Sequence, residues 1–236
     1  MFRWGLYSLR NLWARRVTTA LTVVGLGLVV FVLLAVLMLA HGLERTLGKT
    51  GDPENVIVLR KGALSEIGSS LSREEIRAVA AQPDVRLTAD GRPLAVAEVG
   101  LQLTLRKGQG GSLTSVTLRG TAPEALAVRP AIRLIQGRLW KPGTTEIVVG
   151  ASIARQFPDA RVDRVLHFGN RAWTVVGVFE AGGSGFDSEV WGDAEQFLAT
   201  FHRTTFSSLT LRLAHPATLP AFKDRIERDP RFKFSV

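Results

Sequence analysis

The longest run of hydrophobic positions lies near the start of the chain. Residues 17–40 (VTTALTVVGLGLVVFVLLAVLMLA) contain no Asp, Glu, Lys or Arg. A helix of that length covers roughly 36 Å, which exceeds the roughly 30 Å hydrocarbon core of a bilayer. A buried core helix is rarely apolar on every face, and the apolar region of a signal peptide runs only about 7–15 residues before a small-x-small cleavage site. The exit LMLAHGLE has no Ala-x-Ala, so the pattern predicts a permanent transmembrane helix.

The charges that flank this run predict its orientation. The arginines that precede it, with no acidic residue among them, are Arg3, Arg10, Arg15 and Arg16. On the far side, basic and acidic residues are mixed between residues 44 and 52. The positive-inside bias therefore puts the N-terminus in the cytoplasm and the chain after His41 outside it. We expect these four arginines to flank the membrane, and Arg10, Arg15 and Arg16 to bind anionic lipid headgroups.

Two shorter patterns surround the predicted span. The apolar positions of residues 2–15 recur at helical spacing between the arginines, which indicates an amphipathic helix lying in the membrane interface. An unstructured basic leader is the alternative. Inside the span, Thr18, Thr22 and Gly25 are small residues that allow a neighbouring helix to approach closely.

After residue 54 the pattern changes to short alternating runs and short helical runs. Strands are predicted at residues 55–59, 94–105, 112–118, 146–149, 162–168, 172–179, 206–213 and 232–236. Helices are predicted at residues 72–81, 151–157, 193–200 and 218–228. The first begins at a capping box, Ser72 to Glu75, and stops before Pro83. Gly-rich turns at 108–111 and at Gly169-Asn170 join neighbouring strands.

This order predicts an α+β fold class: one N-terminal transmembrane helix followed by a mixed α/β extracytoplasmic domain of short strands and helices. We expect mostly antiparallel connections, with the helices on one face of the sheet. No second apolar run approaches membrane length, so we expect a single span.

Composition narrows the function classes. The 236 residues contain 30 Lys and Arg against 21 Asp and Glu, a net charge of +9. Beyond the anchor the bases alternate with acids, as in KDRIERDPRFK, so we predict no nucleic-acid partner. The absence of cysteine excludes disulfides, thiolate metal sites and cysteine nucleophiles.

A search for catalytic patterns finds none that is complete. Gly48-Lys49-Thr50 resembles the end of a phosphate-binding loop, but the position that needs glycine is Leu43. The four histidines show no metal-binding spacing, and Ser184 lacks the G-x-S-x-G pattern. We therefore predict no catalytic residue, no cofactor and no metal, and we expect any ATP hydrolysis on a separate subunit.

One glycine-rich loop is a candidate for contact with a partner. Its residues are Gly182, Gly183, Ser184, Gly185, Phe186 and Asp187. An idle surface turn is the alternative interpretation.

Four stretches, taken in order, resemble a known family. They are SLRNLWARRVTTALTVVGLGLVV (8–30), VTLRGTAPEAL (116–126), IQGRLWKPGTTEIVVGASIARQF (135–157) and WTVVGVFEAGGSGFDSEVWGD (173–193). The first resembles the opening of the MacB/LolC/FtsX-type ABC transporter permeases, and the other three resemble the extracytoplasmic core domain of that family. The resemblance implies a basic cytoplasmic or interfacial segment at 1–16, a transmembrane helix at 17–40, a connector at 41–54 and a MacB-like periplasmic core domain at 55–236.

The same resemblance implies a function. It implies a permease subunit of the inner (plasma) membrane that forms a homo- or heterodimer, works with a cytosolic ABC ATPase, and moves or extracts a substrate or periplasmic partner protein outside the cytoplasm. Family members have four spans, and this sequence ends where the second would be approached. We therefore expect either a truncated or split half of a permease, or a permease whose remaining part lies on another polypeptide. The alternative is a single-pass adaptor or assembly protein whose periplasmic domain binds a partner.

Overall fold

The computed structural model describes residues 16–48, 54–108, 111–229 and 233–236. The chain divides into two compact units, with the boundary in the sequence between Lys49 and Thr50. The first contains helix α2, and the second contains every described strand.

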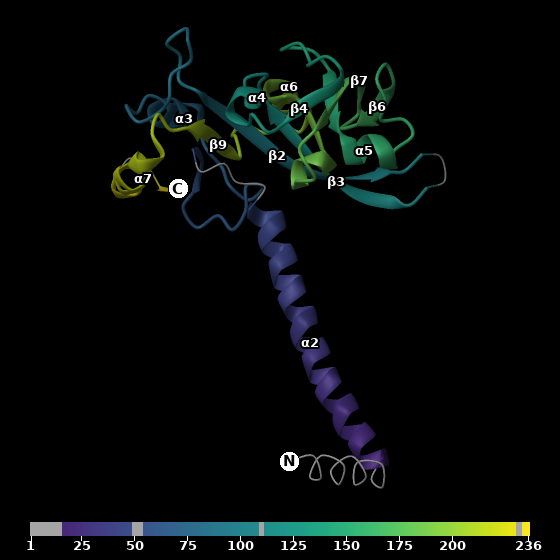
Figure 1. Cartoon of the computed structure of the whole chain (residues 1–236). Helices are drawn as coiled ribbons and strands as arrows, with labels where there is room; N and C mark the ends of the chain where they lie inside the picture. Colours follow the sequence, from purple (N-terminus) through teal and green to yellow (C-terminus); the bar gives the residue numbers. More distant parts are fainter. Residues whose placement is uncertain (1–15, 49–53, 109–110, 230–232) are drawn as a thin grey trace. The chain divides into compact units, whose positions relative to one another are not determined.

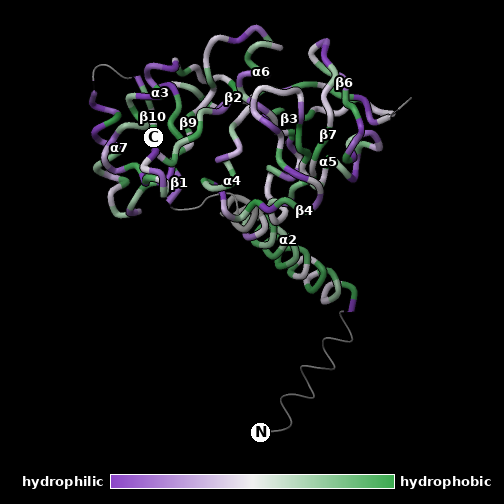
Figure 2. Tube along the Cα trace, turned by 90° about the horizontal axis from the view of Figure 1, so that it is seen from above, coloured by the Kyte–Doolittle hydropathy of each residue, from purple (hydrophilic) through white to green (hydrophobic). Residues whose placement is uncertain are grey.

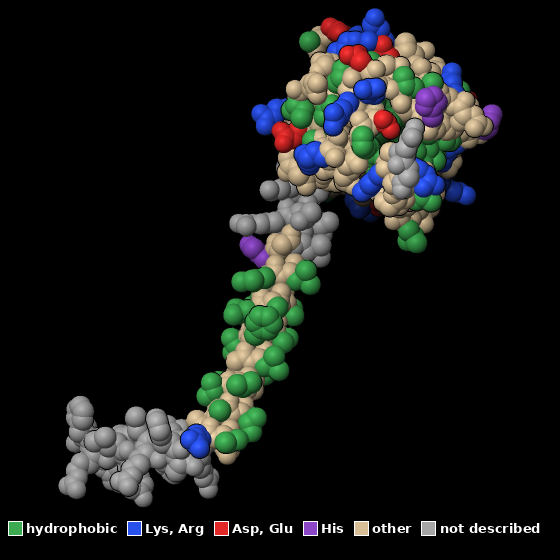
Figure 3. Space-filling view, turned by 90° about the vertical axis from the view of Figure 1, so that its right-hand side faces the viewer, with side chains coloured by type: hydrophobic (Ala, Val, Ile, Leu, Met, Phe, Trp, Pro, Cys, Tyr) green, Lys and Arg blue, Asp and Glu red, His purple; other side chains and the backbone are tan. Residues whose placement is uncertain are grey.

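Helix α2 (Arg16–Gly48) is one continuous helix of 33 residues, about 50 Å long at 1.5 Å per residue. Its side chains up to Gly42 are exposed almost throughout, and hydrophobic residues follow one another along its length (Figures 2 and 3). The helix contains the predicted span and continues past Ala40. The beginning of the segment expected as a connector, 41–54, is therefore helical up to Gly48.

The second unit consists of short strands and helices. The strands are β1 (Asn55–Arg60), β2 (Ala95–Arg106), β3 (Leu113–Thr121), β4 (Arg133–Gly137), β5 (Glu146–Gly150), β6 (Val165–Phe168), β7 (Arg171–Glu180), β8 (Glu189–Asp193), β9 (Ser208–Arg212) and β10 (Phe234–Ser235). The helices are α3 (Arg73–Ala80), α4 (Ala125–Val128), α5 (Ala151–Gln156), η1 (Gly185–Ser188), α6 (Ala194–Thr200), η2 (Pro216–Thr218) and α7 (Leu219–Arg228).

The strands form one sheet in the order β10-β1-β9-β2-β3-β8-β5-β7-β4, and β6 adds to β7. β3 pairs with β8 and β5 pairs with β7 in parallel, while the other ladders of the described strands are antiparallel. Figure 1 shows β2 running from the α3–β9 end of the domain toward the end that carries α5 and β6. The predicted mixed α/β domain with mostly antiparallel connections is confirmed.

Apolar layers cover both faces of the sheet. On β5, Ile147 and Val149 belong to one buried cluster and Val148 to another, as expected when successive side chains alternate across a strand. Helices α5 and α6 contribute to the first cluster, through Ile153 and Phe197. Helix α4 contributes to the second. The expectation that all helices lie on one face is therefore wrong, because α4 packs on the opposite face.

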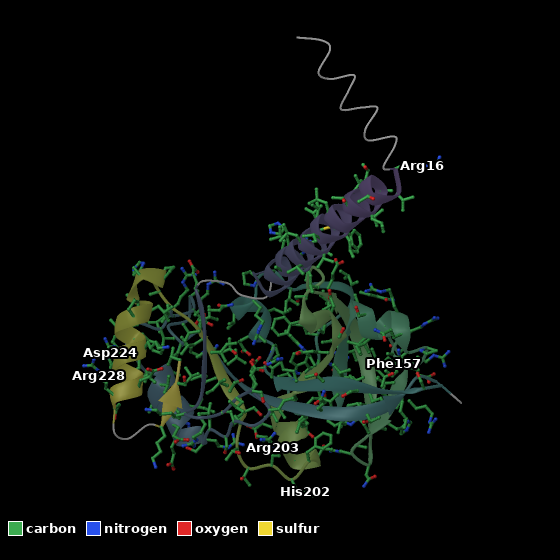
Figure 4. The ribbon with its side chains drawn as sticks, turned by 90° about the horizontal axis from the view of Figure 1, so that it is seen from below. Arg16, Phe157, His202, Arg203, Asp224 and Arg228 are labelled. Carbon is green, nitrogen blue, oxygen red and sulfur yellow. The ribbon has the colours of Figure 1, made fainter. Side chains whose placement is uncertain are left out.

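A third cluster joins β1, β9 and β10 to helices α3 and α7. Phe222 and Ile226 of α7 are buried in it, whereas Asp224 and Arg228 form an ion pair on the outer side of α7, 2.6 Å between Oδ1 and Nε (Figure 4). The helical periodicity of residues 218–228 thus separates a buried from a solvated face.

Two local signals are confirmed in detail. Ser72 accepts a hydrogen bond from the Glu75 N–H while the Glu75 carboxylate accepts one from the Ser72 N–H, which completes the capping box of α3. Gly169 and Asn170 both have positive φ, 59° and 57°. That is the backbone of the tight turns that join antiparallel strands, here β6 and β7.

The short 3-10 helices η1 and η2 were not predicted, and neither were three further elements: α4, β4 and β8. Strand β8 contains Glu, Gly and Asp, which are poor strand formers, and it forms because it is buried between β3 and β5. Strand β4 is exposed at the end of the sheet order, and α4 has four residues. In α4, β4 and β8 the pattern of apolar and polar residues is too short to predict a helix or a strand.

Candidate functional site

Helix α2 is the first candidate site. Among the described residues it is the one helix long and apolar enough to cross a membrane, over Arg16–Gly42, and none of its most apolar stretch is buried in the structure. Arg16 is its first residue and is exposed. Arg3, Arg10 and Arg15 lie outside the described residues, so their membrane-flanking role stays a prediction.

The predicted packing residues lie on one side of α2. Thr18, Thr22 and Gly25 are exposed and spaced four and three residues apart, so they share a face. The Thr22 hydroxyl donates to the Thr18 carbonyl at 2.9 Å, which leaves no unsatisfied donor on that hydroxyl. No heavy atom lies within 4 Å of a Cβ placed on Gly25. The side chains at these three positions are therefore small and leave no unsatisfied donor, which favours close packing of a second helix in lipid.

The glycine-rich loop is folded around one carboxylate. Asp187 is buried, and its two oxygens accept hydrogen bonds from the N–H groups of Ala181 at 2.6 Å and Gly183 at 2.7 Å. Gly182 and Gly183 have φ of +63° and +81°, which favours glycine at both positions. Asp187 thus holds the loop closed from within, and the three glycines 182, 183 and 185 form its exposed part.

Next to this loop lies a network of buried charges that sequence reasoning missed. Glu98 of β2 is fully buried, and its carboxylate pairs with Arg129 through two hydrogen bonds, of 2.9 and 2.5 Å. Arg119 of β3 donates to Glu98 at 3.1 Å and pairs with Glu189 of β8 through two further bonds, of 2.8 and 3.0 Å. Arg119 also donates to Glu66 at 2.8 Å.

Neutral groups complete the network. The hydroxyls of Thr121 and Thr210 lie 3.0 and 2.9 Å from the oxygens of Glu98. The indole N–H of Trp191 donates to Glu189 at 2.8 Å. Both oxygens of Glu98 therefore have a charged and a neutral partner, as a buried carboxylate needs.

Phe186 connects the loop to the network. Its ring lies 5.2 Å from the guanidinium carbon of Arg119 and 5.1 Å from that of Arg129, within cation–π range. It also meets the ring of Trp191 edge to face, with centroids 5.8 Å apart. Ser184 is buried beside it. Phe186 thus packs on both arginines, and the loop predicted to contact a partner is also a structural cover.

The electrostatics of the network favour the ionised form of Glu98. Burial alone raises the pKa of Glu98, but the opposite charges of Arg129 and Arg119 and the hydrogen bonds from Arg129 and Thr210 outweigh it, and the pKa falls to about 2. Burial likewise lowers the pKa of Arg119, while Glu189, Glu98 and Glu66 raise it well above its ordinary value. Glu98 and Arg119 are therefore both charged throughout the physiological pH range.

The arrangement is structural rather than catalytic in its chemistry. Its groups are paired with one another, and the Glu98 carboxylate has no exposed surface. Within the described ranges no group of three or more His, Cys, Asp or Glu is placed to hold a metal ion. One signal for the network exists in the sequence: Glu98 is a charged residue within the otherwise apolar first half of β2, Ala95–Gly100.

Comparison with known proteins places the chain in a family. The family model described as MacB-like periplasmic core domain matches residues 19–229. The chain belongs to this family. The matched region begins inside α2 and ends just after α7. The family model therefore covers most of the apolar helix of this MacB-like chain as well as its folded domain. The expected MacB/LolC/FtsX-type permease domain is confirmed at the level of the family.

Solved structures show the same fold. The extracellular domain of the noncanonic ABC-type transporter YknZ from Gram-positive bacteria matches with a TM-score of 0.57 and 14% identity, over 77% of this chain and 98% of that one. The periplasmic region of MacB from Actinobacillus actinomycetemcomitans matches with 0.57 and 14%, over 77% and 86%. A domain of a putative permease from Porphyromonas gingivalis matches with 0.51 and 15%, over 78% and 89%.

A search among curated proteins finds no match. The structural similarities, at 14–15% identity, show the fold alone.

The first prediction concerns the buried network. Replacing Glu98 by Gln removes the charge that faces Arg119 and Arg129, and a buried pair that loses one partner costs about 3–5 kcal/mol of unfolding free energy. We expect that loss in urea unfolding of the detergent-solubilised full chain, followed by tryptophan fluorescence. Glu180→Gln on an exposed strand end is the matched control, expected within about 0.5 kcal/mol of the wild type. Equal stability of the two variants would contradict the role of the network.

The second prediction concerns pH. Because the pKa of Glu98 in the folded chain, about 2, lies below its ordinary value of 4.5, its ionisation adds stability above pH 4.5 and that stability is lost as the pH falls toward 2. The difference in unfolding free energy between wild type and Glu98→Gln should shrink over this window by roughly 3 kcal/mol. A difference that stays constant from pH 6 to pH 2.5 would show that Glu98 is not held ionised by its partners.

Proposed function

We propose that this chain is a permease subunit, or part of one, of an ABC transporter of the inner (plasma) membrane. The observation that carries this proposal is the family match over residues 19–229, which includes the apolar helix and the folded domain together. Membership of an ABC transporter family implies a cytosolic ATPase and a dimeric permease. The chain would then couple ATP hydrolysis on that ATPase to motion of its domain, for export or extraction of a substrate.

The charge distribution supports an N-terminus in the cytoplasm and a domain outside it. Four arginines, at residues 3, 10, 15 and 16, precede the apolar run that starts at Val17 without an acidic neighbour, and mixed charges follow the span. Helix α2 is continuous from Arg16 to Gly48, so it can pass axial displacement from one membrane surface to the other without an internal break.

The remaining site residues have roles within this proposal. Thr18, Thr22 and Gly25 would face a second membrane helix, of a permease partner, across a small and smooth surface. In the loop, the exposed backbone at Gly182, Gly183 and Gly185 would meet a periplasmic partner or substrate protein, because Phe186 and Asp187 are engaged inside the domain.

Orientation gives the third prediction. The chain contains no cysteine, so single cysteines can be introduced without background. In intact spheroplasts, a membrane-impermeant maleimide should label Leu64→Cys, at a fully exposed position, and should leave Asn11→Cys unlabelled until the membrane is permeabilised. The reverse pattern would overturn the proposed topology.

Partner identity gives the fourth prediction. The tagged full chain, extracted in mild detergent from its own host, should carry an ABC ATPase that mass spectrometry identifies. A control chain whose span is replaced by an unrelated single membrane helix should lose that ATPase while keeping its folded domain. Recovery of periplasmic proteins without any ATPase, from both chains, would favour the single-pass adaptor hypothesis instead.

A further inference from the structure

Strand β2 carries two ladders that follow one another along its length. Residues Ala95–Glu98 pair with β9, and the ladder with β3 begins only at Val99, opposite Gly120. On the side of β3, the first part of β2 therefore has no strand partner among the described residues. We call this opening, between residues Ala95–Glu98 of β2 and the end of β3, the split in the sheet.

The backbone direction of this open edge follows from Gly100. Its N–H donates to the Ser207 hydroxyl at 3.0 Å, and its carbonyl accepts from Arg203 at 3.2 Å, so both groups point to the β9 side (Arg203 is labelled in Figure 4). Successive residues of a strand point their N–H and C=O groups to alternate edges. Ala97 accordingly presents its backbone to the open side, where β3 has already ended.

A groove of about 580 Å³ occupies the split, a size typical of ligand sites. One wall is the segment Leu94–Ala97 at the start of β2, of which Ala95–Ala97 belong to the strand, and the other is the segment Thr121–Glu124 at the end of β3. Three consecutive residues of a strand, here Ala95–Ala97, all line a groove when the groove runs along the edge of the strand, since their side chains alternate between the two faces. The groove therefore exposes backbone rather than one face of the sheet.

The lining is mostly small and apolar, and its charged residues are mostly acidic. The small or proline residues that line it are Pro93, Ala95, Ala97, Ala122, Pro123, Pro142 and Ala194. The charged lining residues are Asp90, Arg92, Glu124, Asp193 and Glu195, which is four acids against one base in a chain whose net charge is +9.

Most of these acids have a partner. Asp193 caps α6 and accepts from the Gly143 N–H, Glu195 pairs with Arg73, and Asp90 pairs with Arg92. Glu124 is exposed, and within the part of the chain that the structure describes its side chain forms no hydrogen bond or ion pair. Its carboxylate is available to a cation that enters the groove.

A second groove on the domain is smaller, is lined by basic rather than acidic residues, and lies beside an irregular strand edge. It has about 470 Å³, lies between Ile135 and α5, and is lined by Arg155 and Arg161 with no acid. Its neighbouring edge strand β4 is interrupted by an irregularity between Leu134 and Gln136, a feature that protects sheet edges from pairing.

We propose that the split in the sheet between β2 and the end of β3 binds an extended peptide segment that carries lysine or arginine, which pairs with the backbone of β2 at Ala97 and places its cationic side chain at Glu124. Strand addition to an open edge obtains affinity from main-chain hydrogen bonds and selectivity from side-chain positions at the rim. This inference concerns the domain itself and does not depend on the coupling to an ATPase.

The fifth prediction tests the mode of binding with the full chain in nanodiscs. A fluorescein-labelled five-residue peptide of alternating valine and lysine should bind saturably, as followed by fluorescence anisotropy, and its glutamate counterpart should bind at least tenfold more weakly. Methylation of alternate backbone nitrogens should reduce the affinity at least tenfold in one register and little in the other. Equal binding of both methylated peptides and of the unmethylated one would overturn strand addition.

Variants of the protein test the location. Glu124→Lys should weaken binding of the lysine peptide about tenfold or more, and Ala122→Trp should abolish it by filling the groove. Asp159→Lys is the matched control, because it makes the same charge reversal at an exposed residue that does not line the groove. Thermal melting of each variant confirms that it is folded. Wild-type affinity in both groove variants, or an equal loss in the control, would overturn the proposed site.

Discussion

The carboxylate of Glu98 must remain charged in the interior, and much of the domain is arranged to allow this. Removing an ion from water costs several kcal/mol unless opposite charges and hydrogen bonds replace the lost hydration. Arg119 and Arg129 supply the charges, and Thr121 and Thr210 supply hydroxyls. These partners come from separate strands and from the end of α4, so satisfying one carboxylate fixes the relative positions of several segments.

The same constraint explains the loop after β7. Keeping water away from the two guanidinium groups lowers the local dielectric constant and strengthens their attraction to the buried carboxylate, and the ring of Phe186 lies against both arginines. Placing that ring requires a sharp reversal of the chain, which Gly182 and Gly183 permit through positive φ and which Asp187 closes with two short hydrogen bonds. A glycine-rich segment that looks like a flexible surface loop is in fact built around a buried charge.

Features that depend on residues close together in the sequence could be predicted, and features that depend on residues far apart could not. The apolar span, the Ser72 capping box and the Gly169-Asn170 turn depend on residues a few positions apart, and local patterns predicted them correctly. The ion network depends on pairs such as Glu98 and Thr210, 112 residues apart, and no periodicity reports such a pair. Strand β8 escaped prediction for a related reason: its residues favour a strand only when β3 and β5 enclose them.

The end-to-end arrangement of two ladders on β2 has a mechanical consequence. The two ladders do not overlap between Glu98 and Val99. The β9 side and the β3 side of the sheet are joined there by the β2 backbone, by the hydrogen bonds of Gly100 with Ser207 and Arg203, and by the ion pairs of Glu98. Because β2 is the strand that links the two ladders here, we expect the sheet to bend more readily at this point than elsewhere. We expect the ion pairs of Glu98, at the end of the first ladder, to oppose that bending.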